Sequence, residues 1–146
     1  MTRGNTGITT TVPLVETSFC NYYYSSREAL FLTTWKPSPQ LTEAGFKAEC
    51  VIQSDIIKRY KPRFILLDNT HFGYQVPPDL QEWFADTLGK IWTAPPLQRI
   101  AQVYNHHLLV QVSLEMIGVY INQLGLRQIE HRTFNDRDEA YKWLVN

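Results

Sequence analysis

The sequence lacks the patterns that mark several common classes of protein. Its 14 basic and 14 acidic residues give a formal net charge of zero, so no overall charge attracts it to nucleic acid or to an anionic membrane. No apolar run approaches the roughly 20 residues that a membrane-spanning helix needs. Residues 1–11 also lack the apolar segment of a secretory signal. We therefore expect a cytoplasmic protein that neither binds nucleic acid nor spans a membrane.

The residues that usually hold cofactors or metals are also scarce. Cys20 and Cys50 are the only cysteines, too few for a disulfide scaffold and without metal or redox spacing. Seven glycines occur, but none forms a glycine-rich loop after a strand. His106 and His107 are adjacent, so their side chains point in different directions, and no carboxylate or cysteine stands at a ligand spacing beside them. The sequence thus predicts no cofactor and no metal site.

The clearest feature that is present is a short apolar run from Arg63 to Leu67. Lys61 and Pro62 precede it, and polar residues follow it from Asp68 onwards. A run this short and this apolar is typical of a strand that is buried on both faces, as at the centre of a parallel sheet.

Strand and helix patterns alternate along the rest of the chain. We expect strands over residues 17–24, 29–35, 63–67, 98–104 and 127–134, and helices over 41–60, 77–92, 109–124 and from 136 to the end. This order, ββαβαβαβα, predicts an α/β fold with a mixed, mostly parallel five-stranded sheet layered by helices. The domain is expected to cover residues 17–146, after a flexible lead-in over residues 1–16.

The helix over residues 41–60 has the strongest periodicity. Thr42 is expected to cap it, with Glu43 in the first turn and Lys47 four residues later. Apolar residues recur every four positions and are expected to face the sheet: Ala44, Ala48, Ile52, Ile56 and Tyr60.

Three stretches carry a resemblance to a known family. They are "LLDNT" (66–70), "VPPDLQEW" (76–83) and "TFNDRDEAYKWL" (133–144). With the order of elements, they make residues 18–145 resemble the SpoIIAA-like branch of the STAS superfamily. The resemblance implies a STAS-like fold. Members of that superfamily include regulatory antagonists that dock on protein partners, transporter-tail domains, and lipid or small-ligand binders.

The turn after the central strand departs from the antagonist pattern. Antagonists of that kind carry a phosphorylatable serine in an Asp-Ser-Ser-Gly-Leu-like turn, whereas this chain reads Asp-Asn-Thr-His-Phe-Gly over residues 68–73. Thr70 is the only hydroxyl residue there that phosphorylation could use. The resemblance therefore does not carry the partner-switching role over to this chain.

Polar and aromatic residues gather where two neighbouring predicted strands end. Open α/β sheets usually bind their ligands at this carboxyl edge, so we expect a contact surface there, with two exposed aromatic side chains. Its expected members are Asp68, Asn69, Thr70, His71, Phe72, Tyr74, Asn105 and His106. Asp68 has a local alternative as the acceptor of an Asx-type turn. No nucleophile or acid–base pair can be identified by spacing, so we do not expect an enzyme.

Two functional hypotheses follow from these patterns. The first is a non-catalytic STAS-like binding or regulatory module that acts through protein contacts. It would self-associate as a homodimer through the aromatic residues of the first hairpin and of loop 69–76. The alternative is a small-molecule or lipid carrier with an apolar pocket between helices and sheet. Its expected walls are Trp83, Phe84, Met116 and Tyr120.

Overall fold

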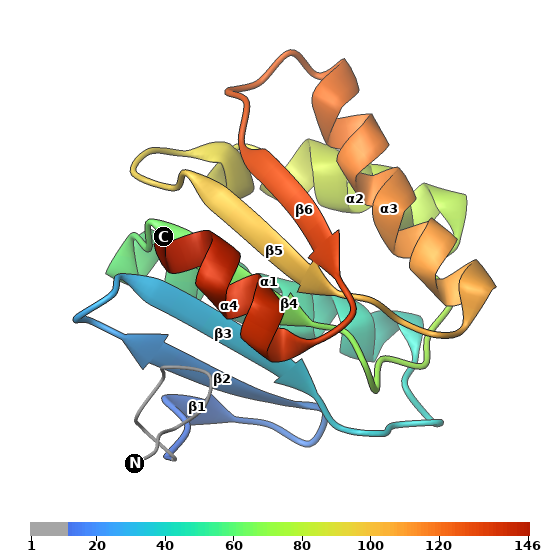
Figure 1. Ribbon diagram of the computed structural model, residues 1–146. Helices are drawn as coiled ribbons and strands as arrows, with labels where there is room; N and C mark the ends of the chain where they lie inside the picture. The colour runs from blue at the N-terminus through green and yellow to red at the C-terminus, as the bar shows by residue number, and fades with distance from the viewer. Residues whose placement is uncertain (1–11) are drawn as a thin grey trace.

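A six-stranded sheet forms the centre of the computed structural model, which describes residues 12–146 (Figure 1). The strands lie side by side in the order of the sequence. They are β1 (Val15–Glu16), β2 (Cys20–Ser25), β3 (Leu30–Trp35), β4 (Phe64–Asp68), β5 (Arg99–Val103) and β6 (Glu130–Phe134). The pairs β1–β2 and β2–β3 are antiparallel, and β3 to β6 are parallel. The predicted α/β class with a mixed, mostly parallel sheet is confirmed.

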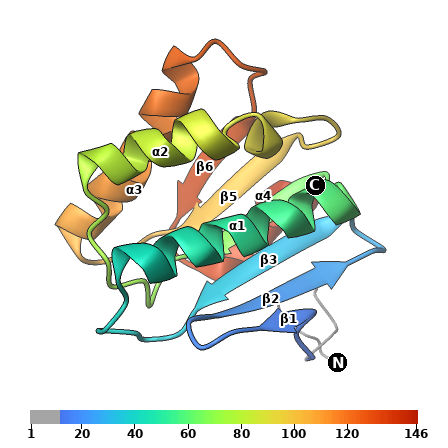
Figure 2. The same cartoon turned by 180° about the vertical axis from the view of Figure 1, so that it is seen from behind.

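Four α-helices cover the two faces of this sheet unequally. They are α1 (Glu43–Tyr60), α2 (Pro78–Leu88), α3 (Leu108–Gln123) and α4 (Arg137–Val145), with a short 3-10 helix, η1 (Ile91–Thr93), after α2. The crossovers through α1, α2 and α3 connect strands that advance in one direction, so right-handed connections place all three on one face. Figures 1 and 2 show α4 alone on the other face, and α3 beside α2 toward β6.

The sheet has six strands, whereas the sequence predicted five. The additional strand, β1, pairs with β2 through Val15 opposite Tyr22 and Glu16 opposite Asn21. It lies within the stretch that was expected to be a flexible lead-in, of which residues 1–11 lie outside the described residues. At two residues, β1 is too short to give a detectable alternating pattern, which is why the sequence missed it.

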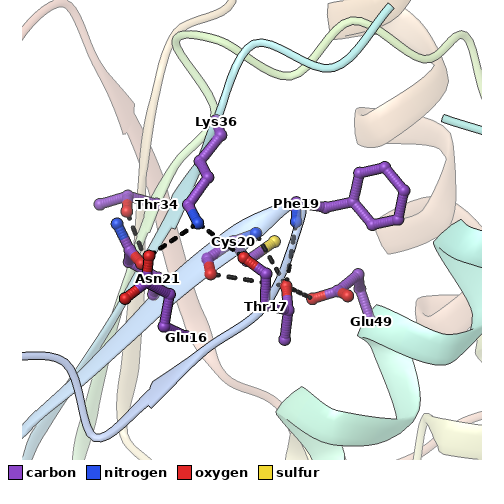
Figure 3. Close-up of polar contacts among 8 residues, drawn as sticks. All are labelled: Glu16, Thr17, Phe19, Cys20, Asn21, Thr34, Lys36 and Glu49. Carbon is purple, nitrogen blue, oxygen red and sulfur yellow. Dashed lines mark hydrogen bonds and ion pairs between the residues drawn. The ribbon is translucent and has the colours of Figure 1, made fainter. Parts of the chain in front are cut away.

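The start of the domain is held to α1 by a set of polar contacts around Thr17 (Figure 3). The Thr17 hydroxyl accepts hydrogen bonds from the backbone N–H groups of Phe19 (3.1 Å) and Cys20 (2.9 Å) and donates to Glu49 of α1 (3.0 Å). Lys36 Nζ donates to the Thr17 carbonyl (2.6 Å). The turn between β1 and β2 is therefore fixed to α1 and to the residue that follows β3.

The ends of α1 follow from local chemistry. The Thr42 side chain accepts a hydrogen bond from Gly45 N (3.2 Å), which confirms the predicted cap. Glu43 and Lys47 form the predicted ion pair one turn apart, at 3.5 Å. The helix ends at Lys61, whose φ of 50° is left-handed, and Pro62 cannot continue it.

The inner face of α1 differs from the predicted one. Ala44 and Ala48 are exposed, whereas the buried residues are Phe46, Glu49, Cys50, Gln53, Ser54, Ile56 and Ile57. Polar side chains can turn inward here because partners reach them from other elements. The Tyr22 hydroxyl donates to Glu49 (2.5 Å), and Trp92 Nε1 donates to Ser54 (3.0 Å). Every-fourth-residue spacing alone could not show these partners.

The α4 face of the sheet has a small core of apolar side chains. Its buried members are Leu30, Leu32, Phe64, Leu66, Ala101, Val103, Ala140 and Leu144. Polar contacts fix both ends of α4 over this core. Arg137 in its first turn pairs with Asp68 at the end of β4 (2.8 Å). Arg99 of β5 donates to the carbonyls of Trp143 (2.8 Å) and Leu144 in its last turn.

Candidate functional site

The carboxyl edge of β4 and β5 brings together the residues that the sequence singled out. Asn105 lies at its centre and is 3% exposed. Its Nδ2 donates to the carbonyls of Asn69 (2.8 Å) and Phe72 (2.6 Å), and its Oδ1 accepts from His107 N (2.9 Å). The Asn105 side-chain amide therefore joins the loop after β4 to the loop after β5. Both of its N–H hydrogens are used, so none remains for a ligand.

Asp68 is also engaged within the protein. Its Oδ1 accepts from the N–H (3.1 Å) and hydroxyl (2.5 Å) of Thr70, which is the Asx-type turn expected as the local alternative. Its Oδ2 accepts from Nη2 (2.8 Å) and Nε (3.1 Å) of Arg137. Burial opposes ionisation of this carboxyl, but the bonds from Thr70 and Arg137 together outweigh it and lower the pKa of Asp68. Asp68 thus serves to hold α4.

The expectation that Phe72 is exposed was wrong. It is 3% exposed, and its ring lies 4.5 Å from the Trp35 ring and 5.9 Å from the Phe46 ring, measured between centroids. Tyr74 is half-buried, 5.7 Å from the same Phe46 ring. The loop folds inward because Asn105 holds its carbonyls. Of the eight residues of the expected surface, only Thr70, His71 and His106 are exposed.

A cavity of about 330 Å³ lies between the sheet and the layer of α1, α2 and α3. Its deep end is lined by buried aromatic and apolar side chains, and several lining residues near the connection from α3 to β6 are exposed, so we place its mouth there. The deep walls include Trp35, Phe46, Cys50, Phe72, Phe84 and Trp92, and the mouth includes Asn122, Arg127, Gln128 and His131.

Helix α3 forms one wall of this cavity with a single stripe of residues. Leu114, Ile117, Gly118 and Ile121 all line it, at the i, i+3, i+4 and i+7 spacing of one helix face. A Cβ built on Gly118 would meet nothing within 4 Å. Glycine inside a helix costs about 0.5–1 kcal/mol relative to alanine. Gly118 therefore leaves space where any other residue would place a side chain.

A buried hydroxyl in the cavity wall has no partner. Thr33 on β3 is 0% exposed, and its Oγ1 makes no hydrogen bond within residues 12–146. It faces α1 because it lies opposite Tyr22 on β2, whose hydroxyl accepts from Gln53 Nε2 (3.2 Å) of that helix. A buried polar group without a partner is unfavourable. The Thr33 hydroxyl is therefore an uncompensated polar group in the wall of the cavity.

Three polar side chains, from the end of β4 and from within β5 and β6, form a directed hydrogen-bond chain on the sheet side. Asn69 Nδ2 donates to Gln102 Oε1 (3.3 Å), and Gln102 Nε2 lies 2.9 Å from His131 Nε2. An amide nitrogen can only donate, so His131 Nε2 accepts and the ring proton lies on Nδ1. Although His131 is exposed as a residue, partial removal of its ring from water lowers its pKa, and the charge of Glu115 opposes this. His131 is therefore neutral near pH 7.

Sequence reasoning found the layer that holds this cavity but not its walls. Of the four walls expected, only Phe84 lines it. Trp83 instead lies under Lys47, whose Nζ is 5.2 Å from the ring centroid, and Met116 and Tyr120 are half-buried on other sides of α3. Gly118, in the middle of a helix rich in apolar residues, was the signal in the sequence that could have indicated open space.

Comparisons with family models, with curated proteins and with solved structures found no match for this chain. None of the helices within residues 12–146 is both long and apolar enough to cross a membrane. Over the same residues, no three His, Cys, Asp or Glu side chains are grouped in a way that could hold a metal ion.

Proposed function

We propose that the protein is a non-catalytic binding domain that holds a small, largely apolar molecule between α1–α3 and the sheet. The observation that carries this proposal is the cavity itself, about 330 Å³ with an unpartnered hydroxyl, Thr33 Oγ1, in its wall. Protein interiors are close-packed and leave few voids larger than a water molecule. Small-molecule sites are concave, mostly apolar and contain a few polar groups, with volumes from about 300 Å³ upwards.

The cavity also has the walls of a binding site. Trp35, Phe46 and Phe72 come from β3, α1 and the loop after β4. The centroid of the Phe72 ring lies 4.5 Å from that of Trp35 and 5.9 Å from that of Phe46. Such aromatic faces suit flat or apolar ligand groups. On the opposite wall, Gly118 keeps α3 from filling the volume, at a cost in helix stability.

The order of elements supports a STAS-like fold for this domain. From β2 to α4 it is the ββαβαβαβα order on which the resemblance to the SpoIIAA-like branch rests. We place the chain in that group as part of the proposal, with a carrier or ligand-sensing role rather than a partner-switching one. The buried state of Asn105 and Phe72 further favours the cavity over the carboxyl edge as the site.

The proposal is tested by titrating the protein with N-phenyl-1-naphthylamine, an uncharged probe whose fluorescence rises in apolar surroundings. We expect saturable binding of one probe per chain. Gly118→Leu should weaken it by at least about tenfold, because the new side chain fills the cavity. Gly118→Ala, the matched control, adds one methyl group and should leave most of the binding. Both variants should melt no lower than the parent, since glycine is the poorer helix former.

Two results would contradict the proposal. One is absence of saturable binding to the parent chain. The other is unchanged binding to a Gly118→Leu variant that circular dichroism shows to be folded, because the probe would then be bound elsewhere.

A second candidate function, protein contact through self-association, is favoured by the outer side of α3. The exposed apolar side chains there and just after its end are Leu108, Leu109, Val112, Val119 and Leu124. Exposed apolar patches often mark interaction surfaces. The aromatic residues of the first hairpin are less suitable than the sequence indicated, because Tyr22 is buried and Tyr23 and Tyr24 are half-buried. A concentration-independent monomer mass in light scattering would remove the homodimer version.

A further inference from the structure

The lining of the cavity has one permanent charge, and it is positive. Within residues 12–146, this lining contains no aspartate and no glutamate, and Arg127 is its only permanently charged residue. His131, also in the lining, is neutral for the reasons given above. A cationic ligand would meet Arg127 with no carboxylate to balance it. The cavity therefore favours a ligand that is neutral or negatively charged.

Arg127 is held in place at the mouth by backbone groups. It follows Gly125, whose φ of 67° ends α3 in the left-handed conformation. Its Nη1 donates to the carbonyls of Leu97 (2.5 Å) and Thr93 (3.3 Å), which tie the connection after α3 to the segment around η1. Within residues 12–146, the guanidinium is thus oriented by neutral carbonyl groups.

Two other arginines have acidic partners, whereas Arg63 donates from Nη2 to the Gln98 side-chain oxygen (3.3 Å). Arg99 pairs with Glu130 at 3.0 Å, and Arg137 pairs with Asp68 at 2.8 Å. No carboxylate of residues 12–146 lies within 4 Å of Arg127. Arginine has five N–H donors in a planar fork, and the bonds that fix Arg127 use only Nη1. Donors on the other two nitrogens remain for a ligand.

Resting on the proposed function, we infer that the ligand is a small amphipathic carboxylate. Its acid group lies at the mouth against Arg127, and its apolar body extends past Ile117 and Gly118 toward the aromatic walls. A carboxylate accepts two parallel bonds from a guanidinium, the strongest common match for this side chain. Gln128 and Asn122, which also line the mouth, are further neutral donors for its oxygens. The apolar body takes the volume that Gly118 leaves open.

The experiment compares acids with alcohols that have the same apolar body. The probes are decanoate with decan-1-ol, and 4-phenylbutanoate with 4-phenylbutan-1-ol, so that an alkyl and an aromatic body are distinguished. Binding is followed by tryptophan fluorescence, because Trp35 and Trp92 line the cavity. The chains titrated are the parent, Arg127→Gln, Arg127→Lys and Arg132→Gln. Arg132→Gln is the matched control, because it removes the same charge from β6 outside the cavity lining.

In Arg127→Gln we expect the affinity for at least one of the two acids to fall about fivefold, the loss of a partly exposed ion pair. The affinity for the matching alcohol should stay within about twofold, and Arg132→Gln should leave both unchanged. Arg127→Lys should restore part of the acid binding, because it keeps the charge but not the fork. Added salt should reduce the preference for the acid in the parent chain.

An equal loss for acid and alcohol in Arg127→Gln would overturn the inference, because it would show that Arg127 only holds the connection after α3. Acid binding that does not change in Arg127→Gln would overturn it as well. In both cases the alcohols still bind to the parent, and the proposed function stands. Absence of binding for all four probes would instead overturn both the inference and the proposed function.

Discussion

The two faces of the sheet are built from the same strands but are packed in different ways. Against α4, the core is small, apolar and closed, and α4 is fixed at both ends by Arg137 and Arg99. Against α1, α2 and α3, the layer buries polar side chains such as Glu49, Gln53 and Gln102 and contains the cavity. Successive residues of a strand point to opposite faces. Neighbouring residues of β4 therefore belong to different environments.

From this difference we expect stability and ligand binding to depend on different faces of the sheet. A closed apolar core loses both transfer energy and packing when a side chain is shortened. Shortening a side chain that already borders a cavity costs less free energy, because it creates no new enclosed void among close-packed neighbours. We expect the α4 side to supply packing stability and the α1–α3 side to tolerate change at a smaller cost.

The largest expected effect is the contrast between Leu66→Ala and Leu67→Ala. Leu66 is fully buried in the α4-side core, whereas Leu67 is half-buried and lines the cavity. Leu66→Ala should lower the free energy of unfolding by about 3–5 kcal/mol, and Leu67→Ala by about 1–2 kcal/mol. Urea denaturation of both variants measures the difference. Equal losses at the two positions would show that the α1–α3 layer is as closely packed as the α4 side.

The next effect concerns the attachment of α4 at Asp68. Asp68→Asn should lower the free energy of unfolding by about 2 kcal/mol at neutral pH, because it removes the charge that Arg137 binds. The folded pKa of Asp68 is depressed, so its contribution is present above the unfolded pKa and is lost as pH falls through the folded pKa. The difference in free energy of unfolding between the parent and Asp68→Asn should therefore disappear in acid. Urea denaturation at several pH values measures this difference.

Glu130→Gln is the matched control for this prediction. It removes the carboxylate of the Arg99–Glu130 pair, in which the Glu130 side chain is 64% exposed, against 14% for the Asp68 side chain in its pair with Arg137. Such surface pairs contribute about 0–1 kcal/mol. A gap for Asp68→Asn that persists unchanged into strong acid would show that the substitution acts through something other than the charge.

The smallest effect compares two neighbouring threonines of β3. Thr33 has an unpartnered hydroxyl on the cavity side, whereas the Thr34 hydroxyl donates to the Asn21 carbonyl (3.3 Å) on the other face. Thr33→Val should raise the free energy of unfolding of the unliganded protein by about 1 kcal/mol. Thr34→Val should lower it by about the same amount. Thermal melts of both variants check this, and a loss at both positions would mean that the Thr33 hydroxyl has a partner.

Local sequence signals predicted most of the elements correctly. Thr42 caps α1, Asp136 accepts from Glu139 N at the start of α4, and Gly125 ends α3 with a positive φ. These signals lie within a few residues of the boundary that they set, so the sequence displays them directly. The central strand was also found from its apolar run, one residue from its observed bounds.

What the sequence by itself determined was the order and approximate extent of the strands and helices, because periodicity and capping are local. The tertiary structure decided which polar groups are inside. Tyr22 reaches Glu49 across 27 positions, and Asn105 reaches Phe72 across 33. Each partner makes the burial of the other possible, and neither is visible beside it in the sequence. The cavity depends in the same way on distant residues, since it exists only where three helices and four strands fail to fill the space between them.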